Sequence, residues 1–208
     1  MIDVAAAIGE RKVIAVIRVP DASIAVEAAL AAAEGGITVI EIPATVPEFE
    51  KAIAQLTRQR DIIVGAATLL KASDAQAAVD AGASFLVSPV FVEDVWDVTL
   101  ETEVLYLPGA ATPSEVFTLL DAGFEMVKVF PAAHLGGPKY IQSLLDVMPG
   151  AQLVPTGGVS TSNIREYFRA GAFAVGVGGS LLPKELLQAR DYEAVSRLAS
   201  GLVAAAGV

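Results

Sequence analysis

The chain has 208 residues, of which 54% are hydrophobic and only 18% charged, and its formal net charge is −10. This composition supplies an extensive core and excludes an intrinsically disordered chain. A chain this acidic without a basic cluster is not expected to bind nucleic acid, although its backbone N–H groups could still bind a small anion such as phosphate.

Cysteine is absent and His134 is the single histidine, which argues against disulfides, thiolate catalysis and the usual multi-histidine metal sites. The N-terminus lacks the basic and apolar regions of a secretory signal. No apolar stretch reaches the roughly 18 residues that a membrane-spanning helix needs. We therefore expect a soluble, cytoplasmic protein with no membrane partner and few options for a metal site.

Short apolar runs rich in β-branched residues recur along the chain. The eight runs span residues 13–19, 38–42, 62–66, 85–88, 104–107, 126–130, 152–156 and 173–177. Each run is too short for a helix and too continuously apolar for a strand with one face in water. Such runs are typical of parallel strands that are covered on both faces.

Stretches with helical spacing lie between these runs, and four of them reach a glycine just before the next strand. These four are residues 23–36, 73–83, 113–125 and 160–172. A short helix around 3–10 and a last helix over 191–206 complete the pattern. Repeated strand–helix units without a linker predict a single (β/α)8 barrel over residues 1–208. An open, doubly wound sheet is the alternative, because periodicity does not report closure.

In such a barrel, polar residues at the carboxyl ends of the strands face the mouth, where active sites lie. This rule selects Arg18, Glu41, Thr45, Thr68, Ser88, Lys128, Thr156 and the glycine pairs that follow the last two strands.

Lys128 in MVKVFP and Glu41 in VIEIP are charges where the pattern predicts buried strands. Burial disfavours the charged form of an amine, and a neutral amine can attack a carbonyl to form a Schiff base. A carboxylate beside it would serve as a general acid–base. The alternative is structural, with a lysine that reaches toward solvent or pairs with glutamate as a simple counter-ion.

Two Gly-Gly pairs follow the seventh and eighth runs, in PTGGVSTSN (155–163) and VGGS (177–180). The loops at these two places are the usual phosphate site of (β/α)8 barrels, because glycine lets backbone N–H groups approach a ligand. One pair alone would indicate only a tight turn. Two pairs in these positions predict a phosphorylated substrate.

Together the ordered motifs VIEIP, VGAATLL, VSP, VKVFPA, PTGGVS and VGGSLL resemble the 2-keto-3-deoxy-6-phosphogluconate and 4-hydroxy-2-oxoglutarate aldolases over essentially the whole chain. The resemblance implies a class I lyase in a (β/α)8 barrel. Its expected substrates are a 2-keto-3-deoxy-6-phosphosugar acid, or a close analogue, cleaved to pyruvate and an aldehyde such as glyceraldehyde 3-phosphate. It also implies a homotrimer, no metal or other cofactor, and a place in carbohydrate metabolism of the Entner–Doudoroff type.

The resemblance also implies roles for individual residues. Lys128 is similar to the Schiff-base lysine and Glu41 to the general acid–base. The positions that match substrate-binding residues are Arg18, Thr45, Thr68, Phe130 and Thr156. The positions that match the phosphate loops are Gly157, Gly158, Gly178, Gly179 and Ser180.

Thr45 is a departure from the family pattern. Phosphogluconate-specific members tend to carry an arginine four residues past the glutamate, in a phrase like TLRT, where this chain has PATV. The proline pattern of VIEIPATVP is closer to that of relatives that cleave the galactonate epimer. Carboxylate binding is therefore expected to depend on Arg18 and Thr68.

Three other functions use the same residues differently. A phosphosugar isomerase, epimerase or synthase would keep the barrel and phosphate loops but use Lys128 only as an electrostatic anchor. A non-catalytic metabolite-binding barrel would keep the pocket alone. A metal-dependent aldolase is disfavoured, because one histidine and one mouth glutamate leave too few ligands.

Overall fold

Strands and helices alternate along residues 3–207, which are the residues that the computed structural model describes. Residues 1, 2 and 208 of the predicted domain lie outside this description. The strands are β1 Val13–Val16, β2 Val39–Pro43, β3 Ile63–Ala67, β4 Phe85–Val87, β5 Leu105–Leu107, β6 Gly109–Ala110, β7 Met126–Val129, β8 Gln152–Pro155 and β9 Val175–Val177. Each of the eight predicted runs overlaps a strand, and β6 is an addition to them.

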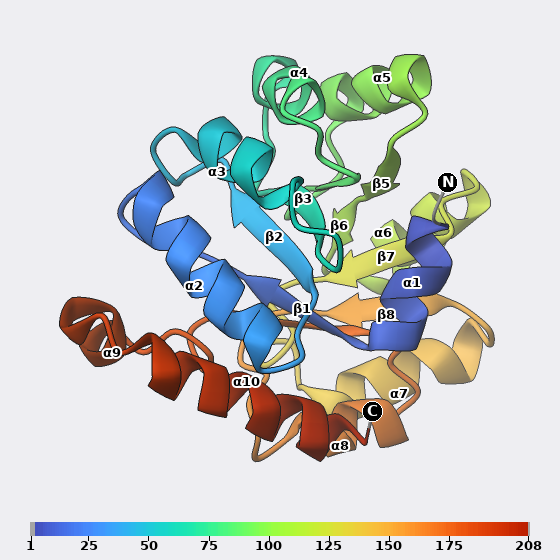
Figure 1. The fold of residues 1–208 in the computed structure, drawn as a ribbon. Coiled ribbons are helices and arrows are strands. Elements are labelled where there is room, and N and C mark those ends of the chain that lie inside the picture. Colours follow the sequence, from blue (N-terminus) through green and yellow to red (C-terminus); the bar gives the residue numbers. More distant parts are fainter. Residues whose placement is uncertain (1–2, 208) are drawn as a thin grey trace.

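The described part of the chain has ten helices, most of which cover the outside of the strands (Figure 1). They are α1 Val4–Arg11, α2 Ala22–Glu34, α3 Phe49–Leu56, α4 Ala72–Asp80, α5 Glu93–Thr102, α6 Pro113–Asp121, α7 Pro138–Val147, α8 Ile164–Arg169, α9 Lys184–Ala189 and α10 Tyr192–Ala206. The predicted first and last helices are confirmed as α1 and α10. Local sequence explains the start of α1, because the Asp3 side chain accepts a hydrogen bond from the Ala6 N–H at 3.0 Å.

All paired strands in the described part of the chain are parallel, and they form two sheets. The order is β5-β4-β3-β2-β1-β9 in the larger sheet and β6-β7-β8 in the smaller one. Thr156 and Gly176 form an isolated parallel bridge between the sheets. On the other side, only Pro108 separates β5 from β6, and its carbonyl accepts the Lys128 N–H at 2.9 Å.

The predicted (β/α)8 barrel is therefore confirmed in part. The fold is α/β with a parallel, six-stranded sheet that curls as a half-barrel, with helices outside it (Figure 1). The described residues do not form one continuous ladder of eight strands, because pairing stops at the two junctions between the sheets.

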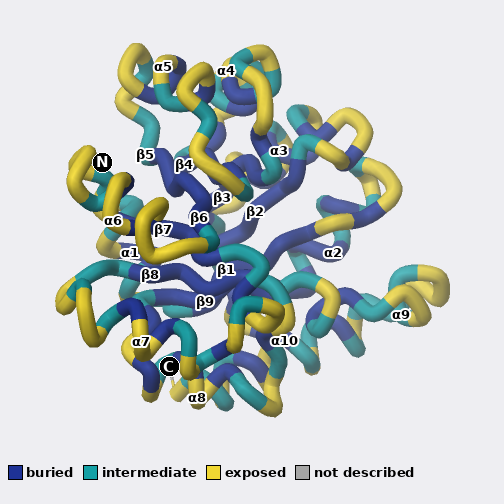
Figure 2. Tube along the Cα trace, turned by 180° about the vertical axis from the view of Figure 1, so that it is seen from behind, coloured by how far each residue is buried: buried dark blue, intermediate teal, exposed yellow. Residues whose placement is uncertain are grey.

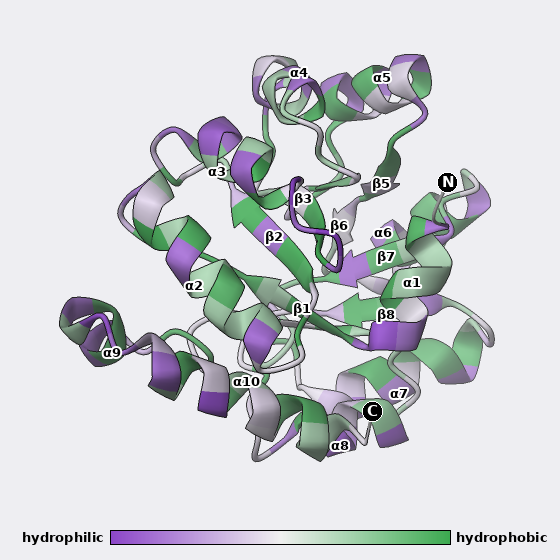
Figure 3. Cartoon of the chain, viewed as in Figure 1, coloured by the Kyte–Doolittle hydropathy of each residue, from purple (hydrophilic) through white to green (hydrophobic). Residues whose placement is uncertain are grey.

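The strands are buried on both faces, as their continuous apolar sequences predict (Figure 2). One apolar cluster lies between the strands and the helices, and Figure 3 shows strands β1 and β2 mostly in the green of hydrophobic residues. A second, smaller cluster lies inside the curled sheets and includes residues of α1, namely Ala7 and Ile8. Helix α1 therefore packs against the inner cluster.

The inner cluster forms the floor on which the polar residues stand. Its members include Val39 of β2, Met126 of β7 and Val154 of β8. Since side chains on one face of a strand recur every second residue, Glu41, Lys128 and Thr156 follow these three on the same face. The fold thus places polar side chains directly above an apolar base.

Residues 3–207 contain no helix that combines the length and hydrophobicity needed to cross a bilayer.

Candidate active site

Lys128 extends from β7 into the interior of the molecule and meets a single carboxylate there. Its neighbours Val127 and Val129 pack in the outer cluster, so the lysine takes the opposite, inward face. Lys128 is only 5% exposed. Its Nζ donates a hydrogen bond to Oε1 of Glu41 at 3.3 Å. The lysine is thus buried and paired, and does not reach toward solvent.

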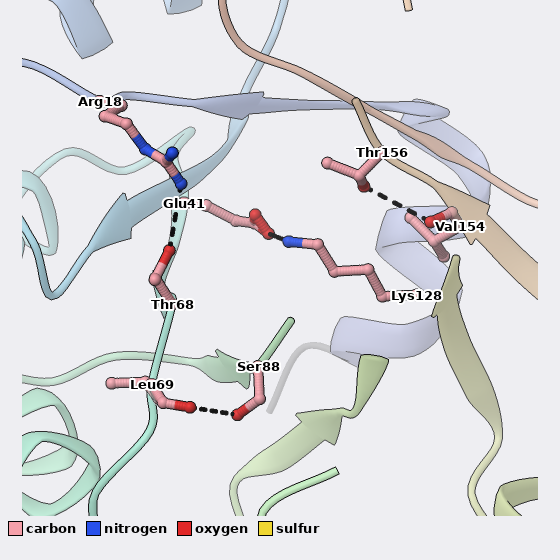
Figure 4. Close-up of polar contacts among 8 residues, drawn as sticks. All are labelled: Arg18, Glu41, Thr68, Leu69, Ser88, Lys128, Val154 and Thr156. Atoms are coloured by element: carbon pink, nitrogen blue, oxygen red, sulfur yellow. Dashed lines mark hydrogen bonds and ion pairs between the residues drawn. The ribbon is translucent and has the colours of Figure 1, made fainter. Parts of the chain in front are cut away.

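Glu41 extends toward Lys128 from β2, in the other sheet (Figure 4). It is 2% exposed, and Ile40 and Ile42 on either side of it pack in the outer cluster. Its second oxygen, Oε2, is buried and has no hydrogen-bond partner among the described residues. Because an unpaired buried carboxylate oxygen is costly, this atom is ready to accept a hydrogen bond from a bound substrate.

Gly65 provides the space beneath this pair. It lies beside Glu41 in the register of β2 and β3. A Cβ at Gly65 would approach the Phe85 carbonyl oxygen to 2.5 Å and its ring to 2.7 Å. Because Gly65 has no side chain, the Phe85 ring can occupy this space in the inner cluster. The charged pair therefore packs against apolar side chains.

Arg18 and Thr68 form a second polar contact at the mouth. The Arg18 Nη2 donates to Thr68 Oγ1 at 3.4 Å, from a largely exposed position just after β1 (Figure 4). Thr68 follows β3 directly, and its φ of 57° lies in the left-handed region, which is unusual for a β-branched residue. The contact leaves a cationic guanidinium near the buried pair.

A cavity of about 720 Å³ opens at this end of the strands. The sequence-predicted residues that line it are Arg18, Phe130, Thr156, Gly157, Gly158, Gly178, Gly179 and Ser180. Val16, the register partner of Glu41, and Phe130, two residues after Lys128, form the part of its wall nearest the charged pair. The structure therefore brings both predicted glycine loops to one cavity beside the lysine.

Backbone conformation explains the first glycine pair. Gly157 and Gly158 have φ values of 96° and 80°, which other residues rarely adopt. A Cβ on Gly158 would also lie 2.3 Å from the Ala133 Cβ. The loop can follow this path, and present its N–H groups, only with glycine.

Side chains tie the two glycine loops in place. Ser180 Oγ donates to the Val159 carbonyl at 2.7 Å, which joins the loop after β9 to the loop after β8. Asn163 Nδ2 donates to the Gly158 carbonyl at 2.9 Å, and Asn163 Oδ1 accepts from the Ser160 N–H at 2.9 Å. Sequence reasoning did not single out Asn163, although it ends the PTGGVSTSN segment, where an asparagine signals a side chain that bonds to the backbone.

Thr156 occupies a tight position at the junction of the two sheets. Its Oγ1 donates to the Val154 carbonyl at 3.4 Å. A Cβ on Gly176, its bridge partner, would lie 2.4 Å from that oxygen. Glycine on β9 thus makes the room that the threonine side chain takes up in the cavity wall.

Two other sequence-selected residues, Thr45 and Ser88, lie apart from this arrangement, as does the single histidine. Thr45 is exposed in the turn after β2 and is not among the residues that line the cavity. Ser88 is buried, and its Oγ donates to the Leu69 carbonyl at 2.7 Å, which is a structural role. His134 is exposed in the turns after β7. Among residues 3–207, no three acidic or histidine side chains gather in a way that could hold a metal ion.

Sequence reasoning also missed Lys184, which lines the same cavity from the first position of α9. A lone lysine after Pro183 looks like any surface lysine, so only the three-dimensional arrangement reveals its place.

The sequence was compared with protein-family models and with known proteins. The family model described as KDPG and KHG aldolase matches residues 4–198. The 2-dehydro-3-deoxy-phosphogluconate aldolase of Pseudomonas aeruginosa is 36% identical over 170 residues, which cover 81% of this chain and 77% of that one.

Two solved structures superpose over nearly the whole chain. KDPG aldolase from Legionella pneumophila, with pyruvate captured as a covalent carbinolamine, has a TM-score of 0.87 and 29% identity, covering 95% of this chain and 97% of that one. The 2-keto-3-deoxy-6-phosphogluconate aldolase of Zymomonas mobilis with 3-phosphoglycerate has a TM-score of 0.85 and 28% identity, covering 96% and 95%.

Proposed function

The chain belongs to the KDPG and KHG aldolase family, and we propose that Lys128 and Glu41 perform the chemistry of that family in it. It is a class I, Schiff-base aldolase, a carbon–carbon lyase that cleaves a 2-keto-3-deoxy-6-phosphosugar acid or a close analogue to pyruvate and an aldehyde. The observation that carries the residue assignment is the buried contact of 3.3 Å between Lys128 Nζ and Glu41 Oε1.

The first half of the reaction forms the covalent intermediate. Transfer of a proton from Lys128 to Glu41 leaves a neutral amine, which adds to the C2 carbonyl of the substrate. The new C–N bond forms as the carbonyl oxygen takes up a proton, which gives a carbinolamine. Glu41 then protonates the departing hydroxyl, water leaves, and the resulting iminium withdraws electrons from C3.

The second half breaks the carbon–carbon bond. Glu41 removes the proton of the C4 hydroxyl, the C3–C4 bonding pair moves into the enamine, and C4 leaves as the carbonyl carbon of the aldehyde. Protonation of the enamine at C3 and hydrolysis of the iminium release pyruvate and restore Lys128. The unpaired Oε2 of Glu41 suits this role, because it can accept the substrate hydroxyl without first losing a protein partner.

The two ends of the substrate have separate binding groups in this proposal. Arg18 and Thr68 bind the carboxylate next to the keto group, with the guanidinium supplying the charge that Thr45 does not. Phe130 and Thr156 line the passage between them and the glycine loops. The backbone N–H groups of the two loops and Ser180 bind the phosphate.

The assignment is tested by trapping the Schiff base. The protein is incubated with pyruvate and borohydride, digested, and mapped by mass spectrometry. We expect the reduced adduct on Lys128 and on no other lysine, with Lys139 on α7 as the internal comparison. An adduct on another lysine, or none under conditions that label a known class I aldolase, would refute the role of Lys128.

We also propose that the chain forms one domain, a (β/α)8 barrel in which β5 and β6 together act as a single interrupted strand. The support is that only Pro108 separates them and that the Thr156–Gly176 bridge joins the sheets on the opposite side. Amide hydrogen exchange tests this closure. Protection in β6 and β8 that matches the larger sheet is expected, and early exchange of the smaller sheet as a separate unit would contradict it.

A homotrimer is the assembly that we propose for the chain. The support is an apolar cavity of about 600 Å³ beside the site, lined by Val90 and Phe91. Phe117 on α6 does not line this cavity, but it is exposed and adjoins the lining residue Thr118 in the sequence. Exposed apolar side chains of this kind favour burial against another subunit. Light scattering coupled to size-exclusion chromatography measures the mass directly, and a monomer at micromolar concentration would contradict the proposal.

A further inference from the structure

The cavity beside the buried pair has a charge that is opposite to that of the chain as a whole. The sequence contains 24 acidic and 14 basic residues. Among the described residues that line the cavity, however, none is acidic, and two are basic, Arg18 and Lys184. A cation-only lining in an acidic protein focuses a positive potential into the cavity and favours an anionic ligand.

The two cations reach the cavity from different segments of the chain. Arg18 follows β1 and contacts Thr68, on the side of the buried Lys128–Glu41 pair. Lys184 follows β9 through the loop that contains Gly178, Gly179 and Ser180. Each cation can therefore pair with an anionic group of a ligand bound in the cavity.

Lys184 is free to bind such a ligand. It is exposed, and within residues 3–207 no acidic side chain lies within ion-pair distance of it. The glycine loops offer N–H groups but no net charge, whereas a phosphate dianion binds more tightly where a full positive charge is also present. Lys184 is the side chain at that end of the cavity that can supply one.

We propose that Lys184 is a specificity-determining residue, whose ammonium group binds the phosphate of the substrate and so selects phosphorylated over unphosphorylated 2-keto-3-deoxy sugar acids. The identity of the substrate in this inference rests on the proposed function, whereas the location of the binding site rests on the cavity alone. Because Lys184 is not part of the hydrogen-bonded pair of Lys128 and Glu41, it should affect binding and leave the chemical step unchanged.

Steady-state kinetics of Lys184→Gln test the proposal with two substrates, 2-keto-3-deoxy-6-phosphogluconate and unphosphorylated 2-keto-3-deoxygluconate. We expect KM for the phosphorylated substrate to rise roughly tenfold, as for loss of one charge-assisted hydrogen bond, with kcat unchanged. The constants for the unphosphorylated substrate should stay the same. Lys184→Arg keeps the charge and should restore most of the affinity.

Lys139→Gln is the matched control, because Lys139 is also exposed, lies on α7, and loses the same charge. If Lys139→Gln raised KM equally, a long-range effect of net charge would explain the result, and the proposed contact would not. An unchanged KM in Lys184→Gln, or an equal loss for both substrates, would overturn the proposal.

A binding experiment separates this inference from the proposed catalytic roles. The affinity for 3-phosphoglycerate, which carries one carboxylate and one phosphate, is measured by calorimetry and compared with that for glycerate. Lys184→Gln should weaken 3-phosphoglycerate binding roughly tenfold and leave glycerate binding unchanged. Labelling of Lys128 by pyruvate and borohydride should persist in Lys184→Gln. If the wild-type protein were not labelled, that result would contradict the catalytic role of Lys128 and not the role of Lys184.

Discussion

In the proposed function, the buried pair and the glycine loops serve the same substrate, but they are built from different parts of the chain. Lys128 and Glu41 are side chains on the middle of strands, almost fully buried, and each is positioned by apolar neighbours that pack on the opposite face. The loops after β8 and β9 are partly exposed and offer backbone N–H groups, and the path of the loop after β8 depends on two glycines with positive φ.

This difference follows from what each end of the substrate requires. Proton transfer and carbonyl addition need groups held at one distance in a dry site, which rigid strands provide. A phosphate needs several donors around a large anion, and the backbone N–H groups of a glycine-containing loop supply them without a buried charge. Substitutions should therefore affect turnover in the first region and substrate affinity in the second.

The largest expected effect comes from Lys128→Met. Without the amine no Schiff base forms, so activity and borohydride labelling should both fall to background. The variant also leaves Glu41 buried without its cation, which should reduce the free energy of unfolding by about 3 kcal/mol. Urea denaturation measures this loss.

The double variant Lys128→Met/Glu41→Gln distinguishes loss of the pair from loss of packing. It should recover part of the lost stability but none of the activity, because the uncompensated charge is removed as well. If it were no more stable than the single variant, the two groups would not be coupled as their contact implies.

Glu41→Gln should have the next largest effect, lowering kcat by about 10²–10⁴-fold, the usual contribution of general acid–base catalysis. Lys128 remains in place, so slow labelling with pyruvate should still occur. The exposed Glu193→Gln on α10 is the control for loss of a carboxylate. Wild-type kcat in Glu41→Gln would show that the carboxylate is only a counter-ion.

In the second region, Gly158→Ala should raise KM for the phosphorylated substrate roughly tenfold and leave kcat nearly unchanged, since a displaced loop loses one phosphate contact. The cause is both the positive φ and the contact with Ala133. Gly201→Ala in α10 is the matched control, because its nearest new contact is an ordinary 3.8 Å and alanine suits a helix. A fall in kcat alone would contradict the division between the regions.

The smallest effect is expected at α6, outside both regions, where Thr112→Ala should cost about 1 kcal/mol of stability without changing activity. Thr112 is the N-cap, and with Glu115 it forms a capping box. Thermal and urea unfolding measure the loss. A change in KM would show that this helix start communicates with the site.

The same capping box predicts a pH dependence. Hydrogen bonds from the Ala111 and Thr112 N–H groups, and then from the Thr112 side chain, lower the pKa of Glu115 below its usual range. A lowered pKa in the folded state means that the stabilisation is present at neutral pH and is lost as pH falls through that folded pKa. The stability difference between wild type and Glu115→Ala should therefore shrink in acid, and a difference that grew would contradict this.

Much of this arrangement could be predicted from the sequence, because its signals are local. Lys128 and Glu41 break an apolar strand pattern, and two glycine pairs recur after consecutive strands. The inward direction of both charged side chains then follows from alternation along a strand. The short strand β6 could not be predicted, since two residues after Pro108 carry no periodicity.

Other features depend on tertiary contacts that sequence order does not report. Thr45 was selected by its position after a strand, but the turn there leaves it exposed and away from the cavity lining. Lys184 was not selected, because only the closeness of the loops after β8 and β9 brings it to the cavity where we propose that phosphate binds. A turn's direction and a cavity's lining are decided by packing among distant segments.

The left-handed conformation of Thr68 has a consequence for attempts to stabilise this protein. A β-branched residue at a φ of 57° carries backbone strain, of about 1 kcal/mol or more, that glycine or asparagine would relieve. Replacing it would therefore make the fold more heat-resistant while removing the hydroxyl that contacts Arg18. Selection for thermostability alone would thus tend to discard the group that we propose to bind the substrate carboxylate, which makes Thr68 a position where stability and the proposed function compete.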